Sequence, residues 1–330
     1  MLNISLKTSQ LRILLTFCCL VATFSMTQAQ TDSSAYSYRS LIDVGYKALP
    51  SGDSLRLDLF VPASATKKKV PLVIVVHGGG WAFGDKEMES IYYMRKLKEE
   101  LLRSDFAVAS ISYRLVSDSV HFPMPVEDCS DAVKWLYKYA DRYRLDTANY
   151  GIWGGSAGAH LAMLVAYANA GEIGGDASLQ GVPLRLNYVI DNFGPTKLND
   201  LFRVNLNGFS TFMFKVFVRK LYDIRLKLTF AMTGYDFKTD KGKVLEVNER
   251  FSPLNYADKP VLPTLIVHGT KDRIVAIKQS EQLQQALEKH QVEHSFIRVE
   301  GGDHGLGNIA KEKTDELVQT TITFIKAHKK

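Results

Sequence analysis

The sequence has little cysteine. Its 330 residues include three cysteines, and two of them, Cys18 and Cys19, lie in an apolar N-terminal stretch. If that stretch is removed, Cys129 alone remains, so the mature chain has no partner for an internal disulfide. A lone cysteine also does not make a zinc site, and we expect neither a metal nor a cofactor.

Strong charge of either sign is also missing. The sequence holds 41 Lys and Arg against 35 Asp and Glu, a net charge of +6. Removal of Lys7 and Arg12 with the N-terminus leaves 39 basic residues against the same 35 acidic ones, a net charge of +4. This mild excess comes without a nucleic-acid-binding motif, so we expect no nucleic-acid partner. The glycines of "HGGGW" lack the lysine of a phosphate-binding loop.

Long hydrophobic runs are absent except at the N-terminus. There, Lys7 and Arg12 precede the apolar run "ILLTFCCLVATFSM" (13–26), and the small residue Ala29 follows it. This pattern is typical of a signal peptide. We predict cleavage after Ala29, with residues 1–29 as the leader and 30–330 as a secreted or periplasmic domain. The alternative is an uncleaved anchor, but the run is short for a membrane span and no basic stop sequence follows it. We expect no membrane span in the mature chain.

The remaining sequence alternates apolar runs with amphipathic stretches. Short apolar runs that stop at glycines predict buried strands, and the stretches between them have helical spacing. This order predicts an α/β fold whose mostly parallel sheet has helices on both faces. The expected strands are 54–61, 70–78, 106–113, 150–155, 186–194, 263–269 and 294–302, and the expected helices are about 87–103, 126–143, 157–170, 277–290 and 311–327.

One segment, about 196–250, breaks this alternation. It is too long for a simple connection, and it contains the aromatic and basic stretch "LNGFSTFMFKVFVRKLYDIRLKLTFAM". We interpret the segment as a helical insertion. Two roles remain open for it: a cap over the functional site, or ordinary helix packing with solvated basic residues.

The stretch "GGSAG" places Ser156 between Gly154 and Gly158, after an apolar strand and before a helix. This spacing is typical of a nucleophile elbow, where small neighbours permit a strained strand-to-helix turn. A serine needs an adjacent base to become a nucleophile. The alternative is a simple helix cap, which is less favoured because later segments of the chain supply a candidate acid and a candidate base.

A second glycine motif, "HGGGW", ends an apolar strand and begins at His77. Amide groups that point at a developing negative charge stabilise the transition state of acyl transfer. We expect the amides of Gly79, Gly80 and Ala157 to form such an oxyanion hole. Trp81 follows directly and either lines a substrate pocket or packs in the core; both interpretations remain open.

Two late loops supply an acid and a base. Asp272 lies in "HGTKDRIV" and His304 in "EGGDHGLG", each after an expected strand, so the chain order is serine, acid, histidine. The ring of His304 can accept the Ser156 proton while Asp272 orients it. Asp303 is a competing acid, but a direct neighbour rarely orients a ring well. We expect His77, His160 and His268 to be structural.

These motifs together resemble the α/β-hydrolase superfamily, specifically the hormone-sensitive-lipase-like and the bacterial feruloyl/acetyl-xylan-esterase-like carboxylesterases. The resemblance spans roughly residues 54–327, and its stations are "HGGGWAFGDK", "SYRLVSDSVHFPMPVEDCSDAVKWL", "YGIWGGSAGAHLA", "DNFGPT", "FSPLNY", "LIVHGTKDRIV" and "GGDHGLG". It implies the α/β-hydrolase fold, the triad Ser156, Asp272 and His304, and oxyanion donors at Gly79, Gly80 and Ala157. The acid station favours the feruloyl/acetyl-xylan type.

The expected function is therefore that of a cofactor-free serine carboxylesterase acting through an acyl-enzyme. The resemblance and the leader together suggest a small ester or an acylated plant oligosaccharide as the substrate. A lipase or peptidase on the same fold is one alternative. A non-catalytic binding protein on a hydrolase scaffold is another.

Overall fold

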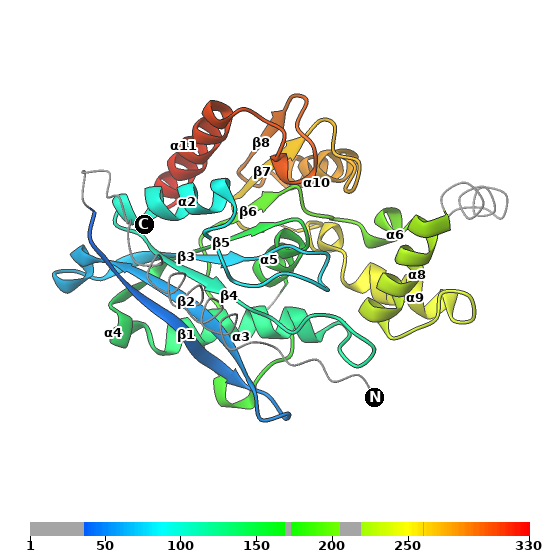
Figure 1. Cartoon of the computed structure of the whole chain (residues 1–330), viewed down its shortest axis with the longest axis horizontal. Coiled ribbons are helices and arrows are strands. Elements are labelled where there is room, and N and C mark those ends of the chain that lie inside the picture. Colours follow the sequence, from blue (N-terminus) through cyan, green and yellow to red (C-terminus); the bar gives the residue numbers. More distant parts are fainter. Residues whose placement is uncertain (1–35, 169–172, 205–218, 260) are drawn as a thin grey trace, which may run out of the picture. The chain divides into compact units, whose positions relative to one another are not determined.

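The computed structural model describes residues 36–168, 173–204, 219–259 and 261–330 (Figure 1). The chain divides into two units, and the second unit, Ser37–Lys330, contains the helices and strands described here. The predicted leader, residues 1–29, lies outside the described residues, so its cleavage stays a prediction.

An eight-stranded sheet forms the centre of the second unit, in the order β1-β2-β4-β3-β5-β6-β7-β8. Pairing is antiparallel from β1 to β4 and parallel from β4 to β8. Because the strands from β3 to β7 are buried almost throughout, their sequences read as apolar runs. The strands are β1 (Tyr38–Ala48), β2 (Ser54–Pro62), β3 (Val70–Val76), β4 (Ala107–Ile111), β5 (Leu145–Gly155), β6 (Val189–Asn192), β7 (Thr264–Gly269) and β8 (His294–Val299).

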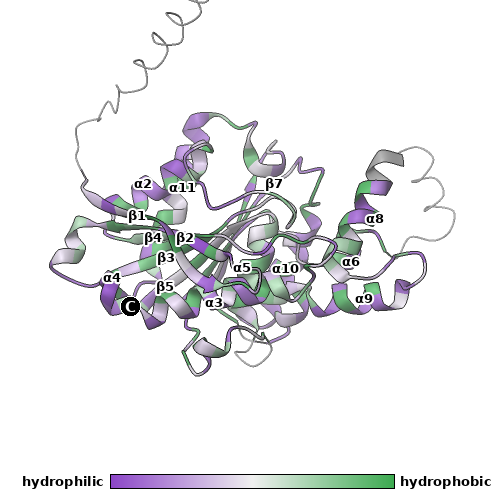
Figure 2. Ribbon diagram, turned by 60° about the horizontal axis from the view of Figure 1, so that its bottom comes forward, coloured by the Kyte–Doolittle hydropathy of each residue, from purple (hydrophilic) through white to green (hydrophobic). Residues whose placement is uncertain are grey.

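Helices cover both faces of this sheet, as the alternation of strands and helices predicts. Because side chains alternate along a strand, Tyr150 and Trp153 of β5, three positions apart, point to opposite faces of the sheet. The Tyr150 hydroxyl donates to the Leu136 carbonyl of α3, whereas the Trp153 ring stacks on Tyr93 of α2. Helices α2 and α11 lie side by side in both views (Figures 1 and 2). The helices are α2 (Tyr92–Arg103), α3 (Met124–Lys138), α4 (Ala140–Tyr143), α5 (Ala157–Tyr167), α6 (Leu198–Leu201), α8 (Arg219–Thr233), α9 (Lys241–Arg250), α10 (Lys278–Lys289) and α11 (Lys311–Ala327).

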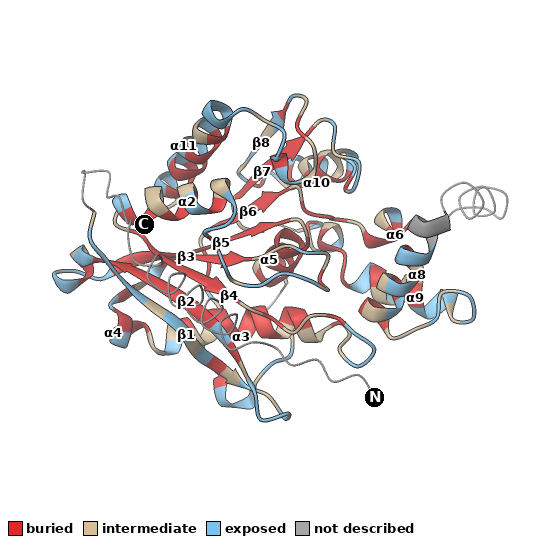
Figure 3. Cartoon of the chain, viewed as in Figure 1, coloured by how far each residue is buried: buried red, intermediate tan, exposed pale blue. Residues whose placement is uncertain are grey.

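Burial explains which elements the sequence predicts well. Helix α5 is buried along almost its whole length and follows the buried end of β5 (Figure 3). The predicted strands and helices all have counterparts, but β1 was not expected. Ten of its eleven positions are exposed or half-exposed, and only Tyr46 is buried. The strand therefore lacks an alternation of apolar and polar residues.

The insertion, about 196–250, contributes α6, α8 and α9, which lie together beyond one end of the sheet (Figures 1 and 2). Residues 205–218 of it lie outside the described residues. Its described part is helical, as the sequence predicts.

A buried charge cluster joins β1 to α3 on the far side of the sheet from α2. Asp128 is fully buried and accepts hydrogen bonds from Lys47 Nζ (2.7 Å) and from two nitrogens of the Arg114 guanidinium (both 2.7 Å). Lys47 also donates to Asp131 (2.6 Å), and burial of these carboxylates is tolerated because every charge has a partner. The cluster therefore attaches the otherwise exposed strand β1 to the core.

Removal of one charge from this cluster should destabilise the fold. We expect Asp128→Asn to lower the free energy of unfolding by about 3 kcal/mol, because it leaves Lys47 and Arg114 short of a buried counter-charge. Urea unfolding followed by circular dichroism measures the change. Asp141→Asn is the matched control, because its exposed ion pair with Lys69 should contribute little. Equal losses in the two variants would contradict the assigned role of Asp128.

Candidate active site

Ser156 stands on a strained turn at the end of β5. Its backbone has φ 54° and ψ −122°, a conformation that is rare for a residue with a side chain. A Cβ atom on Gly154 would lie 2.3 Å from the Gly158 backbone, and one on Gly158 would lie 2.1 Å from the Val76 carbonyl oxygen. Both positions therefore require glycine, and the "GGSAG" pattern follows from this close approach of α5 to β3 and β5.

The three predicted catalytic side chains meet at the carboxyl ends of β5, β7 and β8. The Ser156 hydroxyl donates to His304 Nε2 (2.9 Å), and His304 Nδ1–H donates to Asp272 Oδ2 (2.7 Å). The ring edge of Phe193 packs on His304, with 5.2 Å between ring centroids. This is the serine–base–acid geometry of a nucleophilic hydrolase. It brings together residues that are far apart in the chain: Asp272 lies 116 positions after Ser156, and His304 lies 32 positions after Asp272.

Asp272 is held as an anion by several donors. Its Oδ1 accepts hydrogen bonds from the amides of Ile274 (2.8 Å) and Val275 (2.9 Å), and its Oδ2 lies 3.2 Å from His268 Nε2. Burial opposes ionisation, but the hydrogen bonds from His268 and His304 outweigh it and hold the pKa of Asp272 well below its ordinary value. The carboxylate is therefore ionised at neutral pH and available to orient the His304 ring.

The predicted oxyanion donors lie on two segments. Gly79 and Gly80 have φ 104° and 58° and line the same cavity as Ser156. In the described part of the chain, neither amide has a backbone carbonyl as acceptor. Ala157 is the first residue of α5, where helical geometry leaves the amide without an intrahelical partner. Three unpaired donors at the nucleophile fit an oxyanion hole.

Trp81 does not line this cavity. Its side chain is 3% exposed and packs against Phe122, His160 and Phe202, and the cavity is lined by other residues. Of the two interpretations that the sequence leaves open for Trp81, the structure supports a core tryptophan and not a wall of the substrate pocket. The indole ring lies among buried aromatic side chains and away from the cavity lining.

His77 and His268 have the structural roles expected of them. The His77 ring stacks on Tyr113 with 4.3 Å between centroids, and its Nδ1–H donates to the Gly78 carbonyl (2.8 Å). His268 is fully buried, and its Nε2–H is shared between the Val275 carbonyl (2.9 Å) and the Asp272 carboxylate (3.2 Å). Both rings therefore brace loops of the site.

A cavity of about 680 Å³ opens at Ser156 and His304. Its apolar lining includes the buried side chains of Met88, Met94 and Trp153, and its rim includes the exposed Phe83, Ile91 and Ile274. The volume is within the usual range of small-ligand sites.

The loop from β3 into α2, residues 83–94, supplies much of this lining, whereas no described residue of the 196–250 insertion contributes to it. The cap interpretation therefore finds no support in the described residues.

Sequence reasoning missed two contributors to the site. One is residues 83–94, which were expected only as the beginning of a helix. The other is Asp191 of "DNFGPT", which is fully buried and accepts a hydrogen bond from the Gly194 amide (2.7 Å). Burial raises the pKa of Asp191 to about 7. This bond shapes the turn that places Phe193 against His304, and the "DN-G" pattern after a strand was the available signal.

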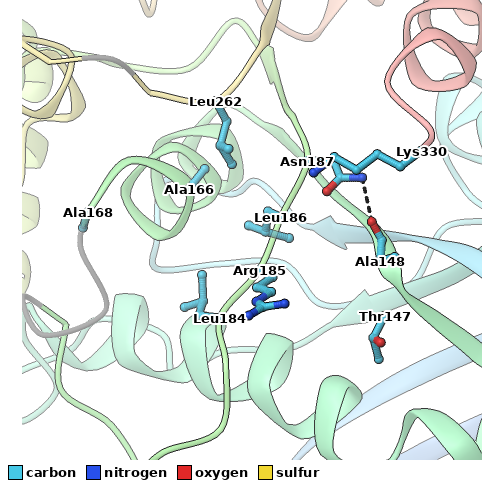
Figure 4. A pocket seen from close by; sticks show the side chains of 10 residues that line it. All are labelled: Thr147, Ala148, Ala166, Ala168, Leu184, Arg185, Leu186, Asn187, Leu262 and Lys330. Atoms are coloured by element: carbon cyan, nitrogen blue, oxygen red, sulfur yellow. Dashed lines mark hydrogen bonds between the residues drawn. The ribbon is translucent and has the colours of Figure 1, made fainter.

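A second cavity, of about 380 Å³, lies near Thr147 and Ala148 at the beginning of β5, with Arg185 and Lys330 in its lining (Figure 4). Ser156 follows the opposite end of the same strand, and none of the predicted site residues lines this second cavity.

The described residues include no group of three His, Cys, Asp or Glu side chains suited to a metal ion. Across the same residues, no helix is both long enough and apolar enough to cross a membrane.

The geometry distinguishes the two candidate acids. We expect Asp272→Asn to lower the rate of nitrophenyl acetate hydrolysis by roughly 10³- to 10⁴-fold, because the amide cannot hold His304 in the required tautomer. Asp303→Asn should leave the rate within about 2-fold, because His304 makes its carboxylate bond to Asp272 instead. A large loss in the Asp303 variant with an active Asp272 variant would reverse the assignment.

Comparison with curated proteins gives partial matches to esterases. The chain is 36% identical to arylacetamide deacetylase of Bos taurus over 110 residues, which are 33% of this chain and 27% of that protein. It is 22% identical to esterase LipC of Mycobacterium tuberculosis over 277 residues, 82% of this chain and 61% of that protein. The matched regions thus span about a quarter and about three-fifths of these relatives.

Solved structures share the fold. A truncated carbohydrate esterase from gut microbiota has a TM-score of 0.67 at 22% identity, with 89% of this chain and 98% of that chain covered. Butyrate-bound esterase Est2 of Thermogutta terrifontis has a TM-score of 0.65 at 19% identity, with coverage of 91% and 98%. The BD-FAE family model matches residues 57–287, a span that includes Ser156 and Asp272. The chain therefore belongs to the BD-FAE family and has the α/β-hydrolase fold, as the sequence motifs predict.

Proposed function

We propose that this protein is a serine carboxylesterase that hydrolyses carboxylic esters through an acyl-enzyme. One observation carries the proposal: the Ser156–His304–Asp272 chain of hydrogen bonds stands beside unpaired amides at the mouth of an apolar cavity. Membership of the BD-FAE family supports it. Each of these parts has a role in ester cleavage.

The geometry sets the order of events. His304 Nε2 accepts the Ser156 proton as Oγ attacks the ester carbonyl, and Asp272 stabilises the resulting imidazolium. The carbonyl oxygen becomes negative and is bound by the amides of Gly79, Gly80 and Ala157. His304 then gives the proton to the leaving alcohol, and the acyl group remains on Ser156. Water repeats the sequence, which releases the acid and restores the serine.

The cavity of about 680 Å³ indicates where the acyl group lies. It extends from Ser156 towards α2 and is lined at depth by Met88, Met94 and Trp153, which are 3%, 8% and 3% exposed. An acetyl group would fill only a small part of this apolar space. We therefore infer that the enzyme accepts acyl groups larger than acetyl, because apolar burial there favours binding in proportion to the area removed from water.

For the natural substrate we propose acylated oligosaccharides that the exported enzyme meets outside the cytoplasm. The charged and apolar pattern of residues 1–29 supports export, and the structural similarity to carbohydrate esterases supports the sugar moiety. A lipase is the second candidate, since the same apolar cavity could hold a long acyl chain. Rates on acetylated xylan, feruloylated sugars and nitrophenyl esters of graded length separate the two.

Replacement of the nucleophile tests the proposed activity. We expect Ser156→Ala to lower the rate of nitrophenyl acetate hydrolysis by roughly 10⁴-fold or more, because no other described side chain can form the acyl-enzyme at this site. Circular dichroism shows whether the variant is folded. A fluorophosphonate probe should label the unsubstituted protein and not the variant. Unchanged hydrolysis in a folded variant would reject the mechanism, and an unlabelled unsubstituted protein would favour a binding role.

Filling the cavity tests its assignment to the acyl group. We expect Met94→Trp to lower kcat/KM for nitrophenyl hexanoate by about 10-fold or more while kcat/KM for the acetate changes little, because the larger ring occupies space that only the longer acyl group uses. The ratio of the two rates is the measurement, so a general loss of folded enzyme cancels. An unchanged ratio would place the acyl group elsewhere.

A further inference from the structure

The two halves of the oxyanion hole belong to segments far apart in the sequence. Gly79 and Gly80 lie in the loop after β3, whereas Ala157 begins α5. Donors must lie within about 0.5 Å of their productive positions to stabilise an oxyanion, so the loop and the helix need a fixed separation. Besides close backbone approaches such as that of Gly158 to the end of β3, a side-chain hydrogen bond joins them.

That connection begins at Trp81, the residue after Gly80. Its indole Nε1–H donates to His160 Nδ1 (3.2 Å), and the two rings meet edge to face, with 5.2 Å between centroids. The Trp81 carbonyl accepts a hydrogen bond from the Val116 amide (3.0 Å). Trp81 is therefore held by its backbone and by its side chain, and it fixes the loop that contains Gly79 and Gly80.

His160 receives this bond on the nucleophile helix. It lies one turn after Ser156, whose carbonyl accepts the His160 amide (3.1 Å), and its Nε2 lies 2.7 Å from the Phe251 carbonyl oxygen. A carbonyl oxygen only accepts, so Nε2 carries the proton and Nδ1 is the acceptor that the Trp81 N–H requires. Complete burial lowers the pKa of His160 to about 3 and keeps the ring neutral, which preserves this single tautomer.

The far end of the connection is the base of the insertion. Phe251 directly follows α9, and Phe202 directly follows α6. Phe202 packs against the Trp81 ring, with 6.3 Å between centroids, and Phe251 packs against Phe122, at 5.2 Å. The described base of the insertion thus contacts the oxyanion loop from behind, on the side of the sheet away from the acyl cavity.

We propose that Trp81 and His160 are positioning residues for ester hydrolysis: the bond from Trp81 to His160, anchored at the Phe251 carbonyl, fixes the Gly79–Gly80 loop against the first turn of α5 and so aligns the two halves of the oxyanion hole. This proposal rests on the proposed esterase function. Neither side chain lines the catalytic cavity, so neither contacts the bound substrate.

The first test removes only the donated hydrogen bond. Trp81→Phe keeps an aromatic ring in the core and loses the N–H group. We expect kcat for nitrophenyl butyrate to fall by about 10- to 100-fold with KM within about 2-fold, because misplaced donors affect the transition state more than the bound ester. Trp135→Phe, on α3 and remote from Ser156, is the matched control and should keep the unsubstituted kcat.

The second test asks whether Trp81 and His160 act through one bond. His160→Leu should lower kcat as Trp81→Phe does, and the double variant should lose no more than the larger single loss, because both changes remove the same interaction. His160→Gln, which retains one acceptor and one donor, should recover part of the loss. Losses that multiply in the double variant would overturn the proposal.

A third measurement separates positioning from a general effect on folding. A trifluoromethyl ketone forms a tetrahedral oxyanion on Ser156, whereas an ether analogue of the ester carries no carbonyl. The inhibition constant of the ketone should rise in Trp81→Phe by the same factor as kcat/KM falls, while that of the ether stays unchanged. An unchanged ketone constant, or equal changes for both inhibitors, would overturn the proposal.

Failure of the positioning proposal can be distinguished from failure of the proposed function. If the unsubstituted protein neither hydrolyses the ester nor binds the ketone, the esterase proposal fails. If the unsubstituted protein does both and a folded Trp81→Phe variant matches it, the esterase proposal stands and the positioning role of Trp81 is rejected.

Discussion

The close approach between the first turn of α5 and the ends of β3 and β5 is the constraint on which the site depends. Because Gly154 and Gly158 have no Cβ, the helix backbone reaches the Val76 carbonyl, and the turn between strand and helix adopts the strained backbone at Ser156. A backbone strained by about 1–3 kcal/mol persists only where the surroundings determine it. Here the surroundings are the buried parallel strands, whose register places Gly155 beside Asn192 and whose carboxyl ends present Asp272 and His304.

The sheet separates two tasks. On the α2 side, residues 83–94 and Trp153 form the apolar cavity that opens at Ser156. On the α5 side, Trp81, His160 and the carbonyl of Phe251 form a buried, neutral chain of hydrogen bonds. Hydrogen bonds in such a dry environment hold their geometry well, because no water competes for either partner. The first side therefore suits recognition of the substrate, and the second suits alignment of the reacting groups.

Much of this arrangement follows from sequence. The buried strands read as apolar runs, and the chain order of Ser156, Asp272 and His304 identifies the triad because those residues follow strands whose ends meet. Strand β1 escaped prediction because most of its side chains are exposed and it is attached by buried ion pairs rather than by an apolar face. The position of Trp81 and the cavity lined by residues 83–94 depend on which face of the sheet a loop folds over, and local patterns do not encode that choice.

The location of the cavity has a consequence for divergence within such a scaffold. The segment 83–94 lies between β3 and the body of α2. Its apolar side chains that line the cavity, Phe83, Met88, Ile91 and Met94, take no part in the elbow, the triad or the bonds of His160, whereas Gly84 packs against His77 and must stay glycine. Selection for a new ester could thus act on a short stretch of chain while the chemical machinery stays constant. Laboratory libraries confined to Phe83, Met88, Ile91 and Met94 would exploit the same independence and sample altered selectivity.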